Sequence, residues 1–232
     1  MKMRWLISFG ITLLAGMALA QDAPALKTPK DKLSYALGMD VANTLRRQSI
    51  EIDPTLFNKG LSDVYSGGKL LLSDEDARAV IGDMQKEMRR KAEEARAQSA
   101  DNNKKVGDTF LAENKKAQGV VTLPSGLQYK VLKAGDGKKP TLEDTVVCQY
   151  RGTLIDGKEF DSSYKRNEPA TFPVKGVIKG WTEALQLMPV GSKWELFIPP
   201  DLAYGERGAG AEIGPNSTLI FDVELVSIKD KP

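Results

Sequence analysis

The residue types that usually carry acid–base and nucleophilic catalysis are scarce in this sequence. Its 232 residues include no histidine and a single cysteine, Cys148. The lack of histidine excludes Ser-His-Asp and Cys-His catalysis and imidazole metal ligands, and we expect neither a metal nor a cofactor. Cys148 lies in an apolar, strand-like stretch, so we expect a buried, unreactive thiol without a disulfide partner. Any chemistry must therefore proceed without the usual proton shuttle.

Aromatic and aliphatic side chains of the carboxy-terminal half remain as candidates. Considered one at a time, aromatics such as Tyr150, Trp181 and Phe221 are most simply interpreted as core residues. Their interpretation changes with the motifs around them, which follow one another between about residues 125 and 229. These motifs are Val147–Leu154, Asp156–Ser163, Val177–Leu185, Met188–Gly191, Ile198–Gly205 and Phe221–Leu225.

In their order and spacing these motifs resemble the FKBP family of peptidyl-prolyl cis/trans isomerases, and so many motifs in register are a specific match. The resemblance implies an apolar pocket that binds the proline of an X-Pro bond. The residues that match catalytic positions of the family are Tyr150, Phe160, Asp161, Ile178, Trp181, Tyr204 and Phe221. The residues that match further substrate contacts are Val177 and Ile213.

The resemblance also implies a role for most of these side chains. We expect Trp181 to form the floor of the proline site. The hydroxyl of Tyr204 and the backbone N–H of Ile178 are candidate donors to a substrate carbonyl. Asp161 is expected to orient the pocket through a hydrogen bond, with Tyr150 as its neighbour, and not to act as a base.

Three positions depart from the family's best-known pattern. Ala170 stands where an aromatic residue often lies, Ala209 where a histidine is common, and Glu212 where an aliphatic residue is usual. Macrolide inhibitors of the family are possible ligands, but the loss of two loop contacts weakens that expectation. The proline site itself should be affected less.

The elements that would position these residues are strands around one short helix. Apolar and polar residues alternate in 127–131, 145–155, 158–162, 192–198 and 219–225, which is typical of half-buried strands. Asp156-Gly157 indicates a hairpin turn. The one helix expected here spans Trp181–Met188 and stops at Pro189. We therefore predict an α+β protein, in which an FKBP-like antiparallel sheet wraps on one short helix.

The amino-terminal half is predicted to be entirely helical. Leu33, Leu37 and Val41 recur every four residues, and Asp53-Pro54 opens a second helix that ends at Gly67. Two short helices cannot build a full core, and small units of this kind need a partner. This half also resembles the exported Mip-like and FkpA-like subgroup of the family, whose amino-terminal helices intertwine, so we expect a homodimer.

A long helix should connect the two parts. Ser73 is expected to cap this helix, carboxylates follow in the first turn, and no proline occurs from there to about Lys116. Between Arg89 and Lys105 alanine is the only apolar residue type, which predicts a solvent-exposed spacer stabilised by helix propensity and charge pairs. We expect the helix to end before Gly119, because glycine commonly follows the last residue of a helix.

The first twenty residues have the pattern of an export signal. Lys2 and Arg4 precede an apolar run, and Ala18-Leu19-Ala20 supplies a small-x-small cleavage site. An amphipathic helix is the alternative, but no polar face interrupts the run, and the stretch is too short for a membrane span. Removal of Lys2 and Arg4 lowers the net charge from +2 to 0, which argues against sequence-independent nucleic-acid binding.

Together these patterns predict four segments and one function. The segments are a signal peptide (1–20), a helical dimerisation domain (21–72), a long connecting helix (73–118) and an FKBP-type isomerase domain (119–232). We predict a periplasmic isomerase, with the outer surface as a second location, that acts on X-Pro bonds of unfolded or partly folded exported proteins and has chaperone activity. The alternatives are a non-catalytic holdase that binds proline-containing segments, and a surface factor that contacts host or envelope proteins.

Overall fold

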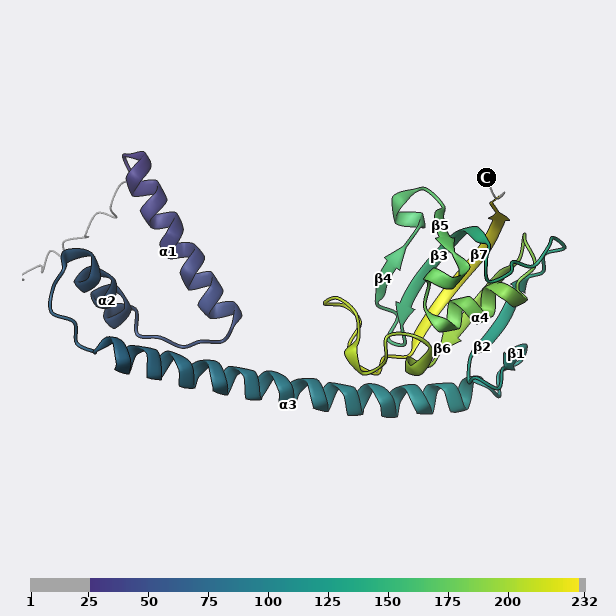
Figure 1. Cartoon of the computed structure of the whole chain (residues 1–232), viewed down its shortest axis with the longest axis horizontal. Coiled ribbons are helices and arrows are strands. Elements are labelled where there is room, and N and C mark those ends of the chain that lie inside the picture. The colour runs from purple at the N-terminus through teal and green to yellow at the C-terminus, as the bar shows by residue number, and fades with distance from the viewer. Residues whose placement is uncertain (1–25, 230–232) are drawn as a thin grey trace, which may run out of the picture. The chain divides into compact units, whose positions relative to one another are not determined.

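The computed structural model describes residues 26–229, so the predicted signal peptide lies outside the described residues. The chain divides into two compact units, one that ends at Asp74 and one that begins at Glu75. The first unit contains helices α1 and α2, and the second contains helix α3 and the whole β-sheet (Figure 1). An all-helical part followed by an antiparallel sheet confirms the predicted α+β class.

Both helices of the first unit begin and end at residues that the sequence marks. Helix α1 (Pro29–Arg47) begins with a capping box, in which the Thr28 hydroxyl accepts from the Asp31 N–H and the Asp31 carboxylate accepts from the Thr28 N–H. Helix α2 (Pro54–Ser66) is capped by Asp53 and ends at Gly67, whose φ of 64° is left-handed.

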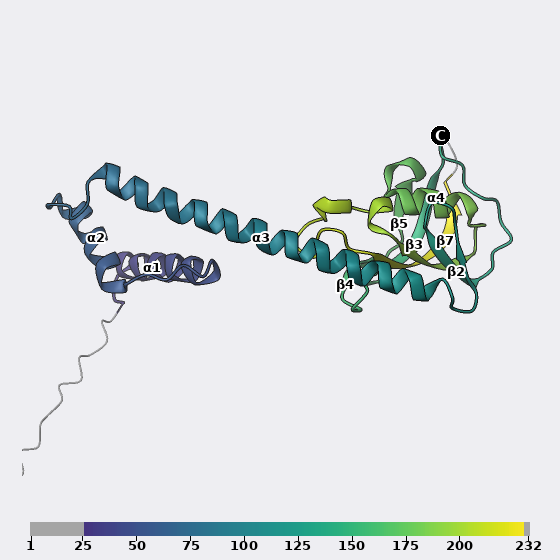
Figure 2. The same ribbon diagram turned by 90° about the horizontal axis from the view of Figure 1, so that it is seen from below.

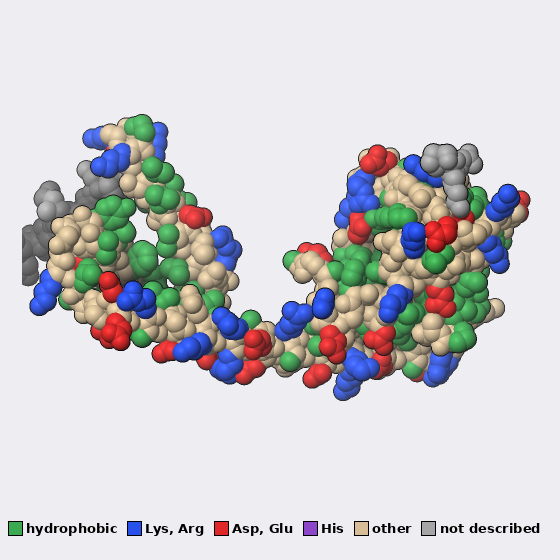
Figure 3. Space-filling view, in the orientation of Figure 1, with side chains coloured by type: hydrophobic (Ala, Val, Ile, Leu, Met, Phe, Trp, Pro, Cys, Tyr) green, Lys and Arg blue, Asp and Glu red, His purple; other side chains and the backbone are tan. Residues whose placement is uncertain are grey.

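The first unit has no interior of its own. None of the residues of α1 or α2 is buried. Their large apolar side chains are exposed instead, among them Leu33 at 61%, Leu56 at 61% and Val64 at 67%. The space-filling view shows such side chains gathered over these two helices (Figure 3).

Helix α3 (Asp74–Asn114) opens the second unit and is about 60 Å long at 1.5 Å per residue. Its carboxy-terminal half runs alongside the sheet in both ribbon views (Figure 2). Here Gly107 is buried, and the Phe110 ring lies 5.9 Å from that of Phe197. The segment from Arg89 to Lys105 is solvent-exposed as predicted, apart from Ala100 and Asn103, which are partly buried. It is more than a spacer, however, because polar side chains of its second half hydrogen-bond to the sheet domain.

Seven antiparallel strands form one sheet, in the order β1-β2-β6-β7-β3-β4, with β5 paired to β3. The strands are β1 (Val120–Thr122), β2 (Gln128–Lys133), β3 (Thr145–Leu154), β4 (Glu159–Ser162), β5 (Ala170–Pro173), β6 (Lys193–Ile198) and β7 (Leu219–Ile228). The sequence analysis did not predict β1 and β5, which are three and four residues long and too short to show a clear alternation.

The core lies between the sheet and helix α4 (Lys179–Leu187). Alternate residues of β3 and β7 face it, and α4 adds Trp181, Ala184 and Leu185 from one side of the helix. The helix begins two residues before the predicted Trp181 and ends one residue before the predicted Met188. Four short 3-10 helices complete the unit: η1 (Tyr164–Arg166), η2 (Val174–Gly176), η3 (Pro200–Leu202) and η4 (Gly205–Arg207).

Candidate active site

A cavity of about 700 Å³ opens beside α4, and all nine residues singled out from the sequence line it. They reach it from separate parts of the fold: β3, β4, the start of α4, the loop around η4, and β7. They are Tyr150, Phe160, Asp161, Val177, Ile178, Trp181, Tyr204, Ile213 and Phe221. The size is in the range of ordinary small-ligand sites.

The buried wall of the cavity is a cluster of edge-to-face aromatic rings. The Trp181 ring lies 5.3 Å from both Tyr150 and Phe221, at 88° and 82° respectively. Phe160 meets Phe221 at 5.4 Å and 83°, and Phe172 meets Trp181 at 5.6 Å and 78°. Such contacts favour one arrangement of the rings over others. The cavity therefore presents a preformed apolar surface.

Gly152 allows two of these rings to come together. On β3 it pairs with Asp161 of β4 on one side and Phe221 of β7 on the other. A Cβ at this position would lie 2.7 Å from atoms of both Phe160 and Phe221. Since van der Waals contact needs more space than this, only glycine lets both rings reach the cavity from their strands.

One carboxylate lies in this apolar wall, and its partners hold it in place. Tyr150 donates its hydroxyl to Asp161 Oδ2 at 2.5 Å, and Arg166 donates from Nη1 to Asp161 Oδ1 at 2.8 Å. Arg166 also donates from Nη2 to the Tyr150 hydroxyl oxygen at 2.7 Å. Partial burial alone would raise the pKa of Asp161, but the hydrogen bonds from Tyr150 and Arg166 and the charge of Arg166 outweigh it, so this pKa lies below its usual value.

Three donors at the cavity have no acceptor among the described residues: the buried Trp181 Nε1, the Tyr204 hydroxyl and the backbone N–H of Ile178. The Tyr204 hydroxyl makes no hydrogen bond there, and Tyr204 is 40% exposed. The backbone N–H of Ile178, the cap residue of α4, also donates to no protein group in that part of the chain. Burial raises the pKa of Tyr204, with a smaller contribution from the charge of Asp161, so its hydroxyl stays protonated at neutral pH. The Tyr204 hydroxyl and the Ile178 N–H can both donate to a bound carbonyl.

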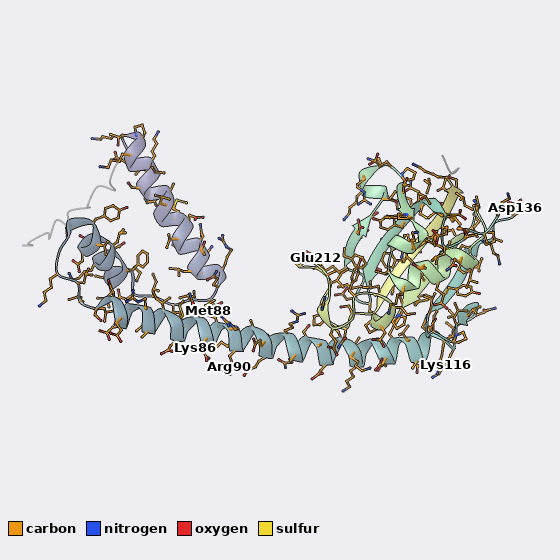
Figure 4. All side chains as sticks on the ribbon, viewed as in Figure 1. Lys86, Met88, Arg90, Lys116, Asp136 and Glu212 are labelled. Carbon is orange, nitrogen blue, oxygen red and sulfur yellow. The ribbon has the colours of Figure 1, made fainter. Side chains whose placement is uncertain are left out.

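The outer rim of the cavity is formed by the loop between η4 and β7. Ala209 and Ile213 pair across this loop through two backbone hydrogen bonds of 2.9 and 3.1 Å. Glu212 lies at its outer end (Figure 4), and its carboxylate forms an ion pair with Lys158 of the β3–β4 hairpin. Glu212 thus ties the loop to the neighbouring hairpin, in addition to replacing an aliphatic contact.

Phe172 and Arg166 are residues of the site that the sequence analysis missed. Phe172 lines the cavity from β5, two residues after Ala170, where the analysis noted a missing aromatic. Arg166 neutralises Asp161 from η1. A signal for Arg166 existed, because a carboxylate among aromatic residues needs a nearby cation. Phe172 is hard to find without the strand assignment.

Other reactive groups lie away from the cavity. Cys148 is fully buried, and this burial raises its pKa to about 12. Among residues 26–229, no group of three or more acidic or cysteine side chains could hold a metal ion. No helix within the same range is long and apolar enough to cross a bilayer.

The fold and this cavity place the chain in a known class. The family described as FKBP-type peptidyl-prolyl cis-trans isomerase matches residues 136–226. The domain that precedes this isomerase in related proteins matches residues 30–131. The chain therefore belongs to the FKBP-type peptidyl-prolyl cis-trans isomerases and is an enzyme of that class, as its motifs predict.

Relatives resemble the chain over its whole length. It is 49% identical to the outer membrane protein MIP of Legionella longbeachae over 231 residues, which cover 99% of both chains. It is 47% identical to the peptidyl-prolyl cis-trans isomerase Mip of Coxiella burnetii over all of both chains. The crystal structure of FkpA from Escherichia coli superposes with a TM-score of 0.70 at 40% identity, and covers 90% of this chain and 100% of its own.

Proposed function

We propose that the cavity is the isomerisation site and that it acts on X-Pro bonds of exported proteins. The observation that carries this proposal is the meeting of nine residues from separate motifs around one apolar cavity, where the Tyr204 hydroxyl and the Ile178 N–H have no acceptor among the described residues. A proline ring would rest on Trp181, with Phe160 and Phe221 beside it. A substrate carbonyl would accept from the Tyr204 hydroxyl or the Ile178 N–H.

The reaction suits a site without a nucleophile. Amide resonance gives the X-Pro bond a rotation barrier of about 18–20 kcal/mol, and unaided exchange takes on the order of tens of seconds or longer. The twisted transition state has lost this resonance, so its carbonyl is less polarised than that of the planar amide. An apolar, aromatic cavity disfavours the charge-separated planar form and favours the twisted one, which lowers the barrier.

Asp161 supports this reaction indirectly in our proposal. Both of its oxygens accept hydrogen bonds from Tyr150, Arg166 and the Ser162 N–H, and its low pKa makes it a poor proton acceptor. Its charge fixes the Tyr150 ring, which in turn packs against Trp181. Asp161 therefore orients the aromatic wall.

We also propose that two copies of the chain associate through their amino-terminal helices. A unit whose helices bury no side chain cannot be stable by itself, because helices this short depend on packing. A second copy offers the same exposed apolar stripes and would cover them. Two isomerase domains in one dimer would hold a client at two points and raise the effective concentration of the second contact.

Location and clients are inferred from the signal-like residues 1–20 and from the relatives. One relative carries the name outer membrane protein, and another is FkpA, an isomerase. We place this chain in the periplasm, with the outer surface as a second location, acting as isomerase and chaperone on unfolded or partly folded exported proteins. The cavity's volume also suits drug-sized macrolide inhibitors.

The test follows the cis-to-trans exchange of a proline-containing peptide catalysed by the mature chain. Tyr204→Phe keeps the ring but removes the donor, and Trp181→Leu removes the floor. We expect kcat/KM to fall about three- to tenfold for Tyr204→Phe, the range set by one hydrogen bond, and further for Trp181→Leu. Tyr164→Phe is the control, since Tyr164 is 42% exposed and does not line the cavity.

Two outcomes would contradict this assignment. Unchanged kcat/KM in both cavity variants would place the reaction elsewhere. A folded wild-type chain that binds the peptide without accelerating its exchange would be a holdase with an isomerase fold. Suppression of client aggregation would then be the activity to measure.

A further inference from the structure

The carboxy-terminal half of α3 holds the loop that forms one rim of the cavity. Arg96 donates from Nη2 to the carbonyl oxygens of Glu206 at 3.2 Å and Arg207 at 3.0 Å. These carbonyls belong to η4, which directly follows Tyr204. A single guanidinium on the helix thus fixes the backbone next to a proposed substrate donor.

A second side chain of α3 holds the other end of the same loop. Asn103 donates from Nδ2 to the carbonyl oxygen of Pro215 at 2.8 Å, and its contact with Ser217 Oγ is 3.5 Å. One turn further on, Gly107 is buried against Thr218, and a Cβ there would collide with the Thr218 hydroxyl. The helix therefore contacts the loop at its beginning and its end.

Between these two contacts the loop is closed on itself. The Asn216 N–H donates to the Gly205 carbonyl at 2.8 Å, and Ala209 and Ile213 pair through their backbones. These backbone hydrogen bonds hold the loop together as one piece. The residues of this piece that line the cavity are Ala209, Gly210, Ala211, Glu212 and Ile213.

We propose that Arg96 and Asn103 of the connecting helix are positioning residues for isomerisation. They act through the loop Tyr204–Thr218 and set the position of the Tyr204 hydroxyl and of Ile213 relative to the aromatic wall. This inference rests on the proposed function of the cavity. It makes the connecting helix a structural part of the catalytic domain.

The helix has anchors that do not depend on these two side chains. Gln128 of β2 donates to the Leu111 carbonyl at 2.9 Å, and Asn114 donates to the Gln128 side chain at 2.9 Å. Phe110 packs on Phe197. Loss of Arg96 or Asn103 should therefore leave α3 attached and the domain folded, and it should free only the loop.

The experiment uses the full mature chain with Arg96→Ala, Asn103→Ala and the conservative variant Arg96→Lys. Arg90→Ala is the matched control, because Arg90 lies on the same helix and its partners within residues 26–229 are Glu87 and Glu94 of that helix. The readouts are kcat and KM for a proline-containing peptide, and hydrogen exchange of the loop amides. Exchange reports on the loop even if the peptide is a poor substrate.

We expect Arg96→Ala and Asn103→Ala to raise KM and to lower kcat/KM about three- to tenfold. This is the size of effect expected when one or two hydrogen bonds that position the loop are lost. The amides of Ala209, Ile213 and Asn216 should exchange faster, while those of β3 and β7 stay protected. Arg96→Lys should restore part of kcat/KM, since an ammonium can still donate to one carbonyl.

Unchanged exchange in the loop together with wild-type kcat/KM would overturn the inference. So would an equal loss of activity in Arg90→Ala, because that loss would come from the helix as a whole. Faster loop exchange with unchanged kcat and KM would show that the loop's position does not matter for catalysis, and would also overturn it. If the wild-type chain were inactive but its loop amides still exchanged faster in Arg96→Ala and Asn103→Ala, the proposed function would be refuted. The finding that α3 holds the loop in position would stand.

Discussion

Tyr150 donates its hydroxyl to Asp161 across 2.5 Å, from β3 to the neighbouring strand β4. Arg166 donates to both groups and closes a three-membered network at the edge of an apolar cavity. The carboxylate is thereby satisfied before any substrate arrives. A group in this state is suited to holding a ring in place and is poorly suited to taking up a proton.

Asp161→Asn separates these two roles. An acid–base group contributes about 10²- to 10⁴-fold to a rate, whereas an orienting group whose neutral isostere keeps part of the network contributes less. We expect the kcat/KM of peptide isomerisation to fall no more than about tenfold. Tyr150→Phe should have an effect of the same size, because it breaks the same network. A loss of a hundredfold or more in a folded Asp161→Asn chain that still binds peptide would establish an acid–base role.

The pH dependence of catalysis should be flat near neutrality. The pKa of Asp161 is lowered, so its contribution to stability is complete above its unfolded value of about 3.9 and is lost as pH falls through the folded pKa. Burial raises the pKa of both Tyr150 and Tyr204, so both stay protonated until pH rises past about 10.

The chain contains no histidine, and neither Asp161 nor the two tyrosines change protonation near neutral pH. We expect kcat/KM to change less than about twofold from about pH 5 to 9. Stopped-flow exchange of a peptide whose own groups do not titrate there measures this profile. A step or a bell shape within the range would reveal a titrating catalytic group that the cavity, as described, does not contain.

The sequence predicted the parts of this fold that have strong local signals. Asp53-Pro54 and Gly67 mark the ends of α2, since caps depend on residue type alone. The nine cavity residues came from matching motifs and not from periodicity, because an aromatic in a pocket and one in a core look alike in sequence. Packing of α3 on the sheet was missed, since Arg96 and Asn103 are polar and their acceptors lie more than 100 residues away.

Gly152 gives a measure of how tightly the aromatic wall is packed. In Gly152→Ala the new methyl group would lie too close to Phe160 and Phe221, and overpacking of this kind costs about 1–3 kcal/mol. We expect a lower urea midpoint of unfolding and a lower kcat/KM. Gly82→Ala is the control, because nothing lies within 4 Å of a Cβ in that helix position, and it should be neutral or add about 0.5–1 kcal/mol. Equal urea midpoints for the two variants would show that the Phe160 and Phe221 rings can shift without lowering the free energy of unfolding.

The exposed stripe of α1 is where dimerisation can be tested. Leu37 is 58% exposed and Leu33 61% exposed, and both are expected to pack on the second copy. Leu37→Glu would place a charge in that interface, where an unpaired carboxylate is costly. We expect light scattering at micromolar concentration to give twice the monomer mass for the mature wild-type chain. For Leu37→Glu we expect the monomer mass together with a loss of helical signal, because the first unit has no core of its own.

Ala36→Glu is the matched control for this variant. It introduces the same carboxylate on the same helix, but on the face shared with Lys32, Asn43 and Arg47. This face lies between the stripe of Leu33, Leu37 and Val41 and a second apolar stripe of Tyr35, Met39 and Ala42. It should remain dimeric and helical. A monomeric wild-type chain would refute the dimer, and a dimeric, fully helical Leu37→Glu would move the interface to another face. Peptide isomerisation should be unchanged in both variants, since the cavity belongs wholly to the second unit.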